Sequence, residues 1–265
     1  HRLVRQVAVA GTDATAIRDA LVRAVTASVG EVYNDSRQWP RWRRLDGHAA
    51  ALAAGLGDSP RSPIAEAHLC NQLAAYRHGA LAAFAEARHF YERVIAIAEK
   101  FIGPEHFETA VGLSNLGGLL REMGDFAAAR ELNERAVKIT ETVSGPDHPN
   151  TAMSLNNLAV VLKEQGEFEA AQRLYERALA IDEKTKGPDD ILVAGDLNNL
   201  GNLLIARGDA AGATPMLERA LAIKEKVRGP AHVDTALGLN NLADAFLKQN
   251  RLDEAERLTR RALAI

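Results

Sequence analysis

Apolar residues recur along most of this chain at the spacing of amphipathic helices. In residues 145–186, Leu155, Leu158 and Leu162 stand at positions i, i+3 and i+7, which predicts a helix with one buried face. Gly166 interrupts this pattern and predicts the turn that ends the helix. A second run with one apolar face follows the glycine and predicts a second helix: Phe168, Ala171, Leu174, Tyr175, Ala178 and Leu179. This segment is therefore expected to fold as a helix–turn–helix unit.

The same unit recurs at a fixed interval of 42 residues. A Gly-Pro pair marks each junction, and the pairs stand at Gly103/Pro104, Gly145/Pro146, Gly187/Pro188 and Gly229/Pro230. Glycine accepts the left-handed conformation at a helix C-terminus and proline cannot continue the helical hydrogen bonds, so each pair should end the second helix of a unit. A fixed period of about 20 to 50 residues indicates a solenoid, in which each unit buries its apolar face against its neighbours.

The expected fold class is all-α: a right-handed α-solenoid of helix–turn–helix units, preceded by a small helical N-terminal segment. Residues 1–63 lack the repeat and are expected to form a helical linker or cap, with helices over about residues 2–10, 13–29 and 38–55. The superhelix is expected over residues 64–265. Its repeats should cover about residues 64–102, 103–144, 145–186, 187–228 and 229–265.

The packing positions of the unit resemble those of the tetratricopeptide repeat (TPR). The residues that carry the resemblance are Leu158, Ala159, Leu162, Gly166, Phe168, Ala171, Tyr175 and Ala178. The usual TPR has 34 residues, so this unit is about two helical turns longer. With its GPxHPxTAxxLNNLA opening and its LYERALAI second helix, it is similar to the kinesin-light-chain type of TPR.

Composition and charge narrow the range of functions. Hydrophobic residues make up 47% of the chain and aromatic residues only 5%, which fits a helical array rich in alanine and leucine. The formal net charge of −3 gives no reason to expect a nucleic-acid partner. Cys70 is the single cysteine, so no disulfide framework is expected. A reducing, cytoplasmic location is expected instead. No apolar run approaches the roughly 18 residues of a membrane span, so no membrane partner is expected.

The N-terminal segment carries a second, shorter resemblance. Its opening HRLVRQ (residues 1–6) and the later WPRWRRL (residues 39–45) are similar to the segment that joins the winged-helix part of bacterial STAND (NB-ARC-like) signalling ATPases to a C-terminal TPR array. The cluster of tryptophan and arginine in the second motif could also be interpreted as a nucleic-acid patch, with indoles stacked on bases. The favoured interpretation is structural: the two tryptophans pack under the first repeat and the arginines face water.

Candidate catalytic and metal-binding groups are few. His106, His148 and His232 recur once per repeat, but helix layers about 8–10 Å apart keep them from meeting at one metal ion. They are expected to cap helices or shape turns. Cys70 falls on an apolar stripe and is expected in the core. The sequence contains no GxxxxGK[ST], HExxH or GxSxG motif, so no catalysis, cofactor or metal is expected in this chain.

The first helix of each repeat carries the residues most suggestive of a binding surface. In TPR superhelices these helices line the concave face, and the resemblance implies the same here. Asn115, Asn157, Asn199 and Asn241 form a ladder at intervals of 42, and a carboxamide offers both a donor and an acceptor to a peptide backbone. Arg121 and Lys163 would favour an acidic ligand residue. The predicted peptide-binding groove consists of Asn115, Arg121, Met153, Asn156, Asn157, Val160, Lys163, Asn198, Asn199, Asn202, Asn240, Asn241 and Asp244.

Several alternatives stay open at this stage. The asparagines could instead bond the neighbouring repeat and fix the pitch of the superhelix. The array could be the sensor or regulatory domain of a STAND-type signalling ATPase, or a free-standing adaptor that gathers partner peptides in its groove. The last repeat reaches residue 265 without a further Gly-Pro pair, so end-to-end stacking of copies is conceivable, and the oligomeric state is not predicted.

Overall fold

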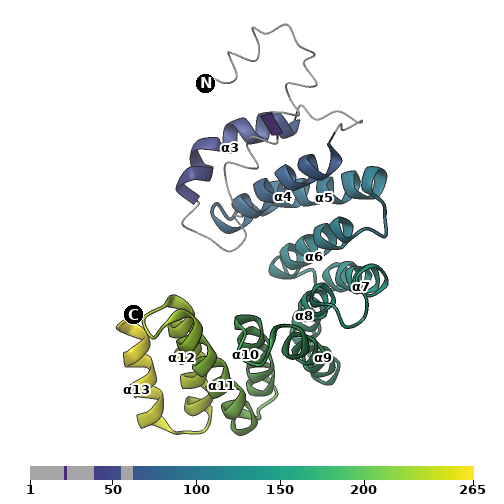
Figure 1. The fold of residues 1–265 in the computed structure, drawn as a ribbon. Coiled ribbons are helices and arrows are strands. Elements are labelled where there is room, and N and C mark those ends of the chain that lie inside the picture. Colours follow the sequence, from purple (N-terminus) through teal and green to yellow (C-terminus); the bar gives the residue numbers. More distant parts are fainter. Residues whose placement is uncertain (1–20, 23–38, 55–61) are drawn as a thin grey trace, which may run out of the picture. The chain divides into compact units, whose positions relative to one another are not determined.

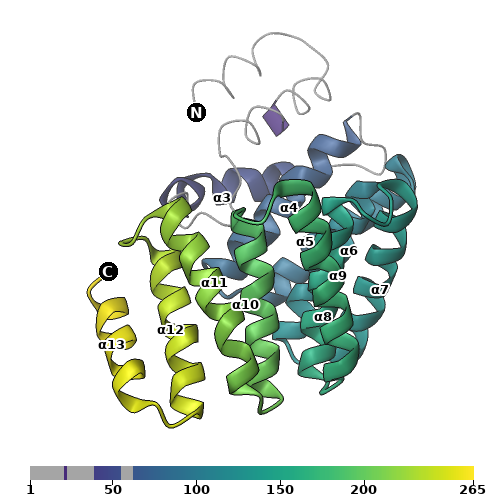
Figure 2. The same ribbon diagram turned by 60° about the horizontal axis from the view of Figure 1, so that its bottom comes forward.

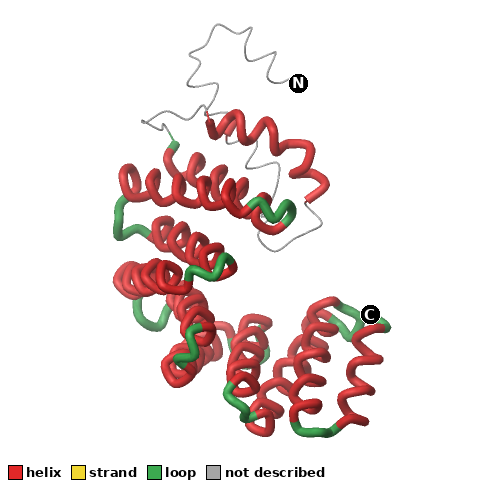
Figure 3. Tube along the Cα trace, turned by 180° about the vertical axis from the view of Figure 1, so that it is seen from behind, coloured by secondary structure: helices red, strands yellow, loops and turns green. Residues whose placement is uncertain are grey.

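The computed structural model describes residues 21–22, 39–54 and 62–265, and this part of the chain is helical throughout, with short loops and no strand (Figures 1 and 3). The chain divides into two compact units, unit 1 (residues 1–139) and unit 2 (residues 140–265). The all-α class and the solenoid of helix pairs are therefore confirmed.

In the described part of unit 1, the helix α3 (Trp39–Ala54) precedes the helix pairs of the repeats. The helices of these pairs are α4 (Pro63–Gly79), α5 (Phe84–Ile97), which continues as a π-helical turn (Ala98–Ile102), α6 (Phe107–Glu122) and α7 (Phe126–Val143), whose last turn extends into unit 2. The helix expected over residues 38–55 agrees with α3 to within one residue at each end. The helices expected over residues 2–10 and 13–29 lie outside the described residues, apart from residues 21 and 22, which are helical.

Unit 2 is a row of antiparallel helix pairs (Figure 2). Its helices are α8 (Pro149–Glu164), α9 (Phe168–Lys186), α10 (Ile191–Ala206), α11 (Ala210–Arg228), α12 (Val233–Lys248) and α13 (Leu252–Leu263). Each helix packs on the next along the chain, and α10 also contacts α12 directly. No helix in the described part of the chain has both the length and the apolar character needed to cross a membrane.

The conserved spacing of small residues lets the paired helices approach closely. Ala159 on α8 and Ala171 on α9 are completely buried, and Tyr175 fills the space beside them with 1% of its surface exposed. At the register of Ala159, α10 carries Gly201, where a Cβ atom would stand only 2.6 Å from the Leu217 side chain on α11. Larger residues at this register would therefore force the pair apart.

The GPxHPxT motif proves to be the joint between repeats. The Thr151 hydroxyl donates a hydrogen bond of 2.7 Å to the Gly145 carbonyl, and Nδ1 of His148 accepts one of 3.1 Å from the backbone N–H of Asn150 at the start of α8. His148 is thus the N-cap residue of α8, which confirms the predicted capping role. The same contacts recur at the other two motif copies, through Thr109 and His106 and through Thr235 and His232.

Arginine side chains on the second helices join consecutive repeats. In unit 2, Nη1 of Arg177 lies 2.5 Å from Oε1 of Glu141, and Nη1 of Arg219 lies 2.6 Å from Oε1 of Glu183. In unit 1, Arg135 pairs in the same way with Glu99 at 2.6 Å. These pairs are partly exposed, so each contributes little to stability on its own.

Helix α3 docks on the first repeat through an aromatic contact and an ion pair. Trp42 is completely buried, and its ring stacks on Tyr76 of α4 with centroids 6.0 Å apart. Both Nε and Nη2 of Arg77 donate hydrogen bonds to the Asp46 carboxylate at 3.1–3.2 Å. The neighbouring Arg43 is exposed, as are Arg41 and Arg44. The structural interpretation of this motif is therefore confirmed for Trp42, which has no face available for a nucleic-acid base.

Candidate functional site

Some first helices of successive repeats contact each other directly. Helix α10 contacts α12 in unit 2, and α4 contacts α6 in unit 1, whereas the second helices α9, α11 and α13 of unit 2 show no comparable contact with one another. In unit 2 the surface formed by the exposed and half-buried residues of α8, α10 and α12 is called the first-helix face below. It carries most of the residues that the sequence predicts for the groove.

A hollow of about 430 Å³ opens on the first-helix face between α8, the end of α9 and α10. Four predicted groove residues line it, namely Met153, Asn156, Asn157 and Asn199. The other lining residues were not predicted from the sequence; they are Pro149, Asn150, Asp182, Lys186, Ile191, Leu192, Gly195 and Asp196. The walls are therefore apolar at Met153 and Leu192, which are 47% and 48% exposed, while amides and two carboxyl groups supply the polar surface.

The remaining predicted residues lie outside this hollow. In unit 2, Val160, Lys163, Asn198, Asn202, Asn241 and Asp244 are half-buried and Asn240 is exposed. In unit 1, Asn115 and Arg121 are half-buried on α6. The structure thus brings only part of the predicted set together in one hollow.

The predicted groove asparagines include some that bond a neighbouring repeat and some whose amides are free. Nδ2 of Asn115 donates to Oδ1 of Asn71 on the preceding repeat at 2.7 Å, and Nδ2 of Asn156 donates to Oδ1 of Asp196 at 2.5 Å. These two amides bond the neighbouring repeat, as the structural alternative requires. Within the part of the chain that the structure describes, the side chains of Asn157, Asn199 and Asn241 make no such bond and keep their donors and acceptors available.

The two predicted cations of the groove each stand beside an acid of their own helix. Nη2 of Arg121 lies 3.3 Å from Oε1 of Glu122, and Nζ of Lys163 lies 3.3 Å from Oε1 of Glu164. Neither residue lines the hollow. The structure therefore gives the expected preference for an acidic ligand residue no support at the hollow itself.

Two buried carboxyl groups form the floor of the hollow. Asp182 on α9 is 4% exposed and Asp196 on α10 is 3% exposed, and both face each other across the helix pair. The pKa of Asp196 is raised to about 7, mainly because the carboxyl group is buried; the adjacent Asp182 contributes to this rise and the hydrogen bond from Asn156 acts against it. Burial also raises the pKa of Asp182. At neutral pH the pair can therefore share one proton.

This pair makes a prediction about pH. The pKa of Asp196 is about 7 in the folded chain against an ordinary value of 3.8, so the folded state binds more protons than the unfolded state between these two pH values. Its contribution to stability is fully present below pH 4 and is lost as the pH rises to about 7, with a slope of up to about 1.4 kcal/mol per pH unit. The melting temperature of Asp196→Asn should fall less between pH 5 and pH 8 than that of the wild type. In Asp253→Asn, which removes an exposed carboxylate, the fall should match the wild type; equal slopes in all three proteins would contradict the assignment.

A glycine inside α10 keeps the hollow open. Gly195 stands at the register occupied by Met153 in the preceding repeat and Leu237 in the following one, and a Cβ atom there would meet nothing within 4 Å. Glycine inside a helix costs roughly 0.5–1 kcal/mol relative to alanine. Gly195 therefore serves no packing purpose in the helix pair, and its lack of a side chain enlarges the space above the carboxyl pair.

A matched pair of substitutions on α10 distinguishes the two glycines. Gly195→Ala should stabilise the chain by roughly 0.5–1 kcal/mol, because it adds helix propensity without a clash. Gly201→Ala should destabilise it by about 1–3 kcal/mol, because the new methyl group overlaps Leu217. Chemical denaturation of the two variants measures both effects. Equal effects of either sign would show that the packing around α10 differs from this description.

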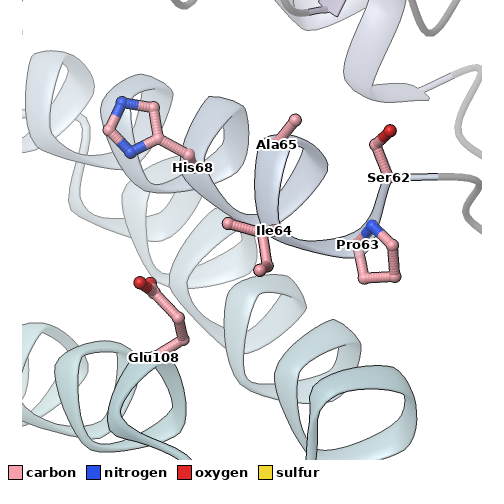
Figure 4. Close-up of a pocket in the computed structure, with 6 residues that line it drawn as sticks. All are labelled: Ser62, Pro63, Ile64, Ala65, His68 and Glu108. Carbon is pink, nitrogen blue, oxygen red and sulfur yellow. The ribbon is translucent and has the colours of Figure 1, made fainter.

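Other candidate chemistry finds no site in the described residues. No group of three histidine, cysteine, aspartate or glutamate side chains there is arranged to hold a metal ion. Cys70 is buried in α4, and burial raises the pKa of its thiol to about 12, so it is a core residue as expected. Unit 1 has a second hollow, of about 470 Å³, between the start of α4 and Glu108 of α6, lined also by the exposed Ile64 and by His68 (Figure 4). It lies apart from every predicted groove residue.

Comparisons with known proteins agree with this description. The family model "Tetratricopeptide repeat" matches residues 64–142, 113–184 and 194–265. Among solved structures, BtubC (BKLC) from P. vanneervenii is 26% identical with a TM-score of 0.64, covering 92% of this chain and 90% of its own. A putative kinesin light chain from Podospora anserina with nearly identical TPR-like repeats is 25% identical with a TM-score of 0.64, covering 78% and 96%.

A third solved structure, NprR in complex with its cognate peptide NprX, shares the fold at 13% identity, with a TM-score of 0.65 and coverage of 99% of this chain and 72% of its own. No curated protein matches the chain. The matched repeats cover most of the sequence, and this repeat builds non-catalytic scaffolds for protein interaction. The chain belongs to the tetratricopeptide repeat family and is similar to its kinesin-light-chain-like members.

Proposed function

We propose that this chain is a peptide-binding module, and that an extended peptide segment of a partner protein lies along the first-helix face of unit 2. The observation that carries the proposal is the set of unpaired amides at equal register, Asn157, Asn199 and Asn241, of which Asn157 and Asn199 line a hollow that no side chain fills. Three carboxamides spaced by one repeat offer donors and acceptors to a peptide backbone whatever its sequence. The apolar walls at Met153 and Leu192 add contacts for ligand side chains.

The wider comparison supports this class of function. NprR, which shares the fold, is solved in complex with its cognate peptide NprX. A row of free amides can hold the backbone of an extended peptide through hydrogen bonds, so affinity should depend on the amides whatever the sequence of the ligand. Asn115 and Asn156, whose amides already bond a neighbouring repeat, are assigned to the stability of the array. The other predicted groove residues remain proposed contacts.

The proposal predicts that removal of the free amides weakens peptide binding without destabilising the fold. The chain is screened against a library of random octapeptides, and the tightest peptide is titrated against the wild type and Asn157→Ala/Asn199→Ala. The double variant should bind about ten-fold or more weakly, because two hydrogen bonds are lost, while its melting temperature shifts only slightly. Gln165→Ala, which removes an exposed amide at the end of α8, is the control and should bind as the wild type does. A double variant that melts much earlier would show that the ladder is structural.

We also propose, from the shorter resemblance, that the module is the cytoplasmic sensor or regulatory domain of a STAND-type signalling ATPase. In this arrangement residues 1–63 form a helical linker that caps residues 64–265. The docking of α3 on α4 through Trp42 and Asp46 supports a linker that is mechanically joined to the array. The encoding gene tests this: an upstream P-loop and winged-helix segment would support the sensor role. Their absence would favour the alternative, a free-standing adaptor.

A further inference from the structure

The hollow of unit 2 has a chemical character that the amide ladder does not explain. A site that held only a peptide backbone would need amides and apolar walls. This one ends instead on Asp182 and Asp196, whose side chains are more than nine-tenths buried. Oδ1 of Asp182 and Oδ2 of Asp196 have no donor from any other described residue. Each can be satisfied within the protein only if one carboxyl group keeps a proton for the other.

The acids are departures from the repeat. At the register of Asp196 the other repeats carry Gly112, Ser154 and Gly238. At the register of Asp182 they carry Ala98, Thr140 and Lys224. Because the neighbouring repeats pack at these positions without an acid, the solenoid itself does not require this carboxyl pair. A buried and incompletely bonded carboxyl pair destabilises a fold, so its presence needs another reason.

Resting on the proposed peptide-binding function, we propose that the hollow receives the basic side chain of a lysine or arginine of the ligand, whose cationic end binds Asp182 and Asp196. The hollow suits such a group in shape as well as in charge. Met153, Ile191 and Leu192 form an apolar wall for the aliphatic stem, and the acids form the floor for the ammonium or guanidinium. The missing side chain at Gly195 leaves the space through which the stem passes.

The charges around the pair come from the end of α9 and the start of α10. Glu183 and Asp190 add negative charge, and Lys186, which lines the hollow and is exposed, adds one positive charge. Helix α8 contributes the neutral Asn150 and Asn156 to the lining. Without a ligand the pair keeps a proton; an entering cation replaces that proton, which passes to the solvent, and leaves both carboxylates ionised. Binding should therefore tighten as the pH rises from 6 to 8.

The test uses the octapeptides that bind the full chain. Selected peptides should carry lysine or arginine at one common position. Replacing that lysine with norleucine, or that arginine with citrulline, should weaken binding about ten-fold to a hundred-fold, the size expected for loss of a charge-assisted hydrogen bond. Asp196→Asn and Asp182→Asn should weaken binding of the basic peptide to the same degree and leave binding of the neutral peptide unchanged. Both variants should also abolish the increase in affinity between pH 6 and 8. Asp253→Asn removes an exposed acid of α13, outside the first-helix face, and should spare the basic peptide.

Failure of this inference can be told apart from failure of the proposed function. Gly195→Met fills the hollow with the side chain that Met153 provides in the preceding repeat. One outcome is that basic and neutral peptides bind the wild-type chain equally well and that Gly195→Met blocks both. The cation site would then be wrong, and the peptide-binding groove would still be supported. If the Asp182 and Asp196 variants no longer weaken peptide binding once Lys186 is replaced by methionine, the carboxyl pair binds Lys186 and not the ligand. The cation site is then also wrong. If peptides bind with no effect of Gly195→Met or of the amide variants, the groove itself is wrong.

Discussion

Replacing Leu158 with alanine is expected to lower the free energy of unfolding by about 2–5 kcal/mol. Leu158 lies on the buried stripe of α8 with 7% of its surface exposed. Removing its isobutyl group takes away contacts between α8 and α9 and leaves a cavity that neighbouring rigid helices fill only in part. Because each repeat is held mainly by its neighbours, the loss should weaken the whole of unit 2. Chemical denaturation followed by circular dichroism measures the effect.

The control for this truncation is Val227→Ala. Val227 ends α11 with 48% of its surface exposed, so its truncation should change the free energy of unfolding by no more than about 0.5 kcal/mol. If both variants unfold at the same denaturant concentration, Leu158 does not occupy a packed core. The helix register derived from the repeat would then be wrong by at least one position.

Replacing Trp42 with alanine is expected to release α3 from the first repeat. Trp42 is the largest side chain of α3 that is completely buried, and its only aromatic neighbour in the described residues is Tyr76. Truncation of a buried tryptophan costs about 3–5 kcal/mol. The remaining contacts of α3, which include the Asp46–Arg77 pair and the small buried Ala49 and Ala53, are too weak to offset that loss. Hydrogen exchange should therefore become fast in α3 while the repeats keep their protection.

Arg43→Ala provides the comparison for the tryptophan variant. Arg43 is exposed on the same helix, so its replacement should leave the exchange of α3 unchanged. If Trp42→Ala also leaves α3 protected, the helix is held by other contacts and does not depend on the buried indole. If α3 and the repeats lose protection together, the helix is an integral part of the first repeat instead of a separate cap.

The helix pairs could be predicted because their periodicity reports burial directly. Leu155, Leu158 and Leu162 repeat at the helical period, and burial of that stripe is the only arrangement that removes it from water. The histidine caps could be predicted for a similar local reason. His148 stands directly before a helix and bonds a backbone N–H two residues away, which needs no knowledge of the tertiary structure.

The candidate site could be predicted only in part, because its central contacts join different helices. Asp182 and Asp196 meet across the α9–α10 pair, and their approach depends on the angle at which those helices pack. Asn156 was predicted as a groove residue, with a bond to the neighbouring repeat left open as the alternative, and the structure shows its amide bonded to Asp196. One signal was available: both acids depart from the residues that other repeats carry at the same register.

The most direct test of the account is a crystal structure of the chain with the tightest octapeptide from the library. The account predicts an extended peptide on the first-helix face of unit 2, with its backbone bonded to the amides of Asn157 and Asn199 and a side chain in the hollow beside Gly195. A peptide bound on the surface of α9, α11 and α13, or in the hollow of unit 1 beside Ile64, would contradict it.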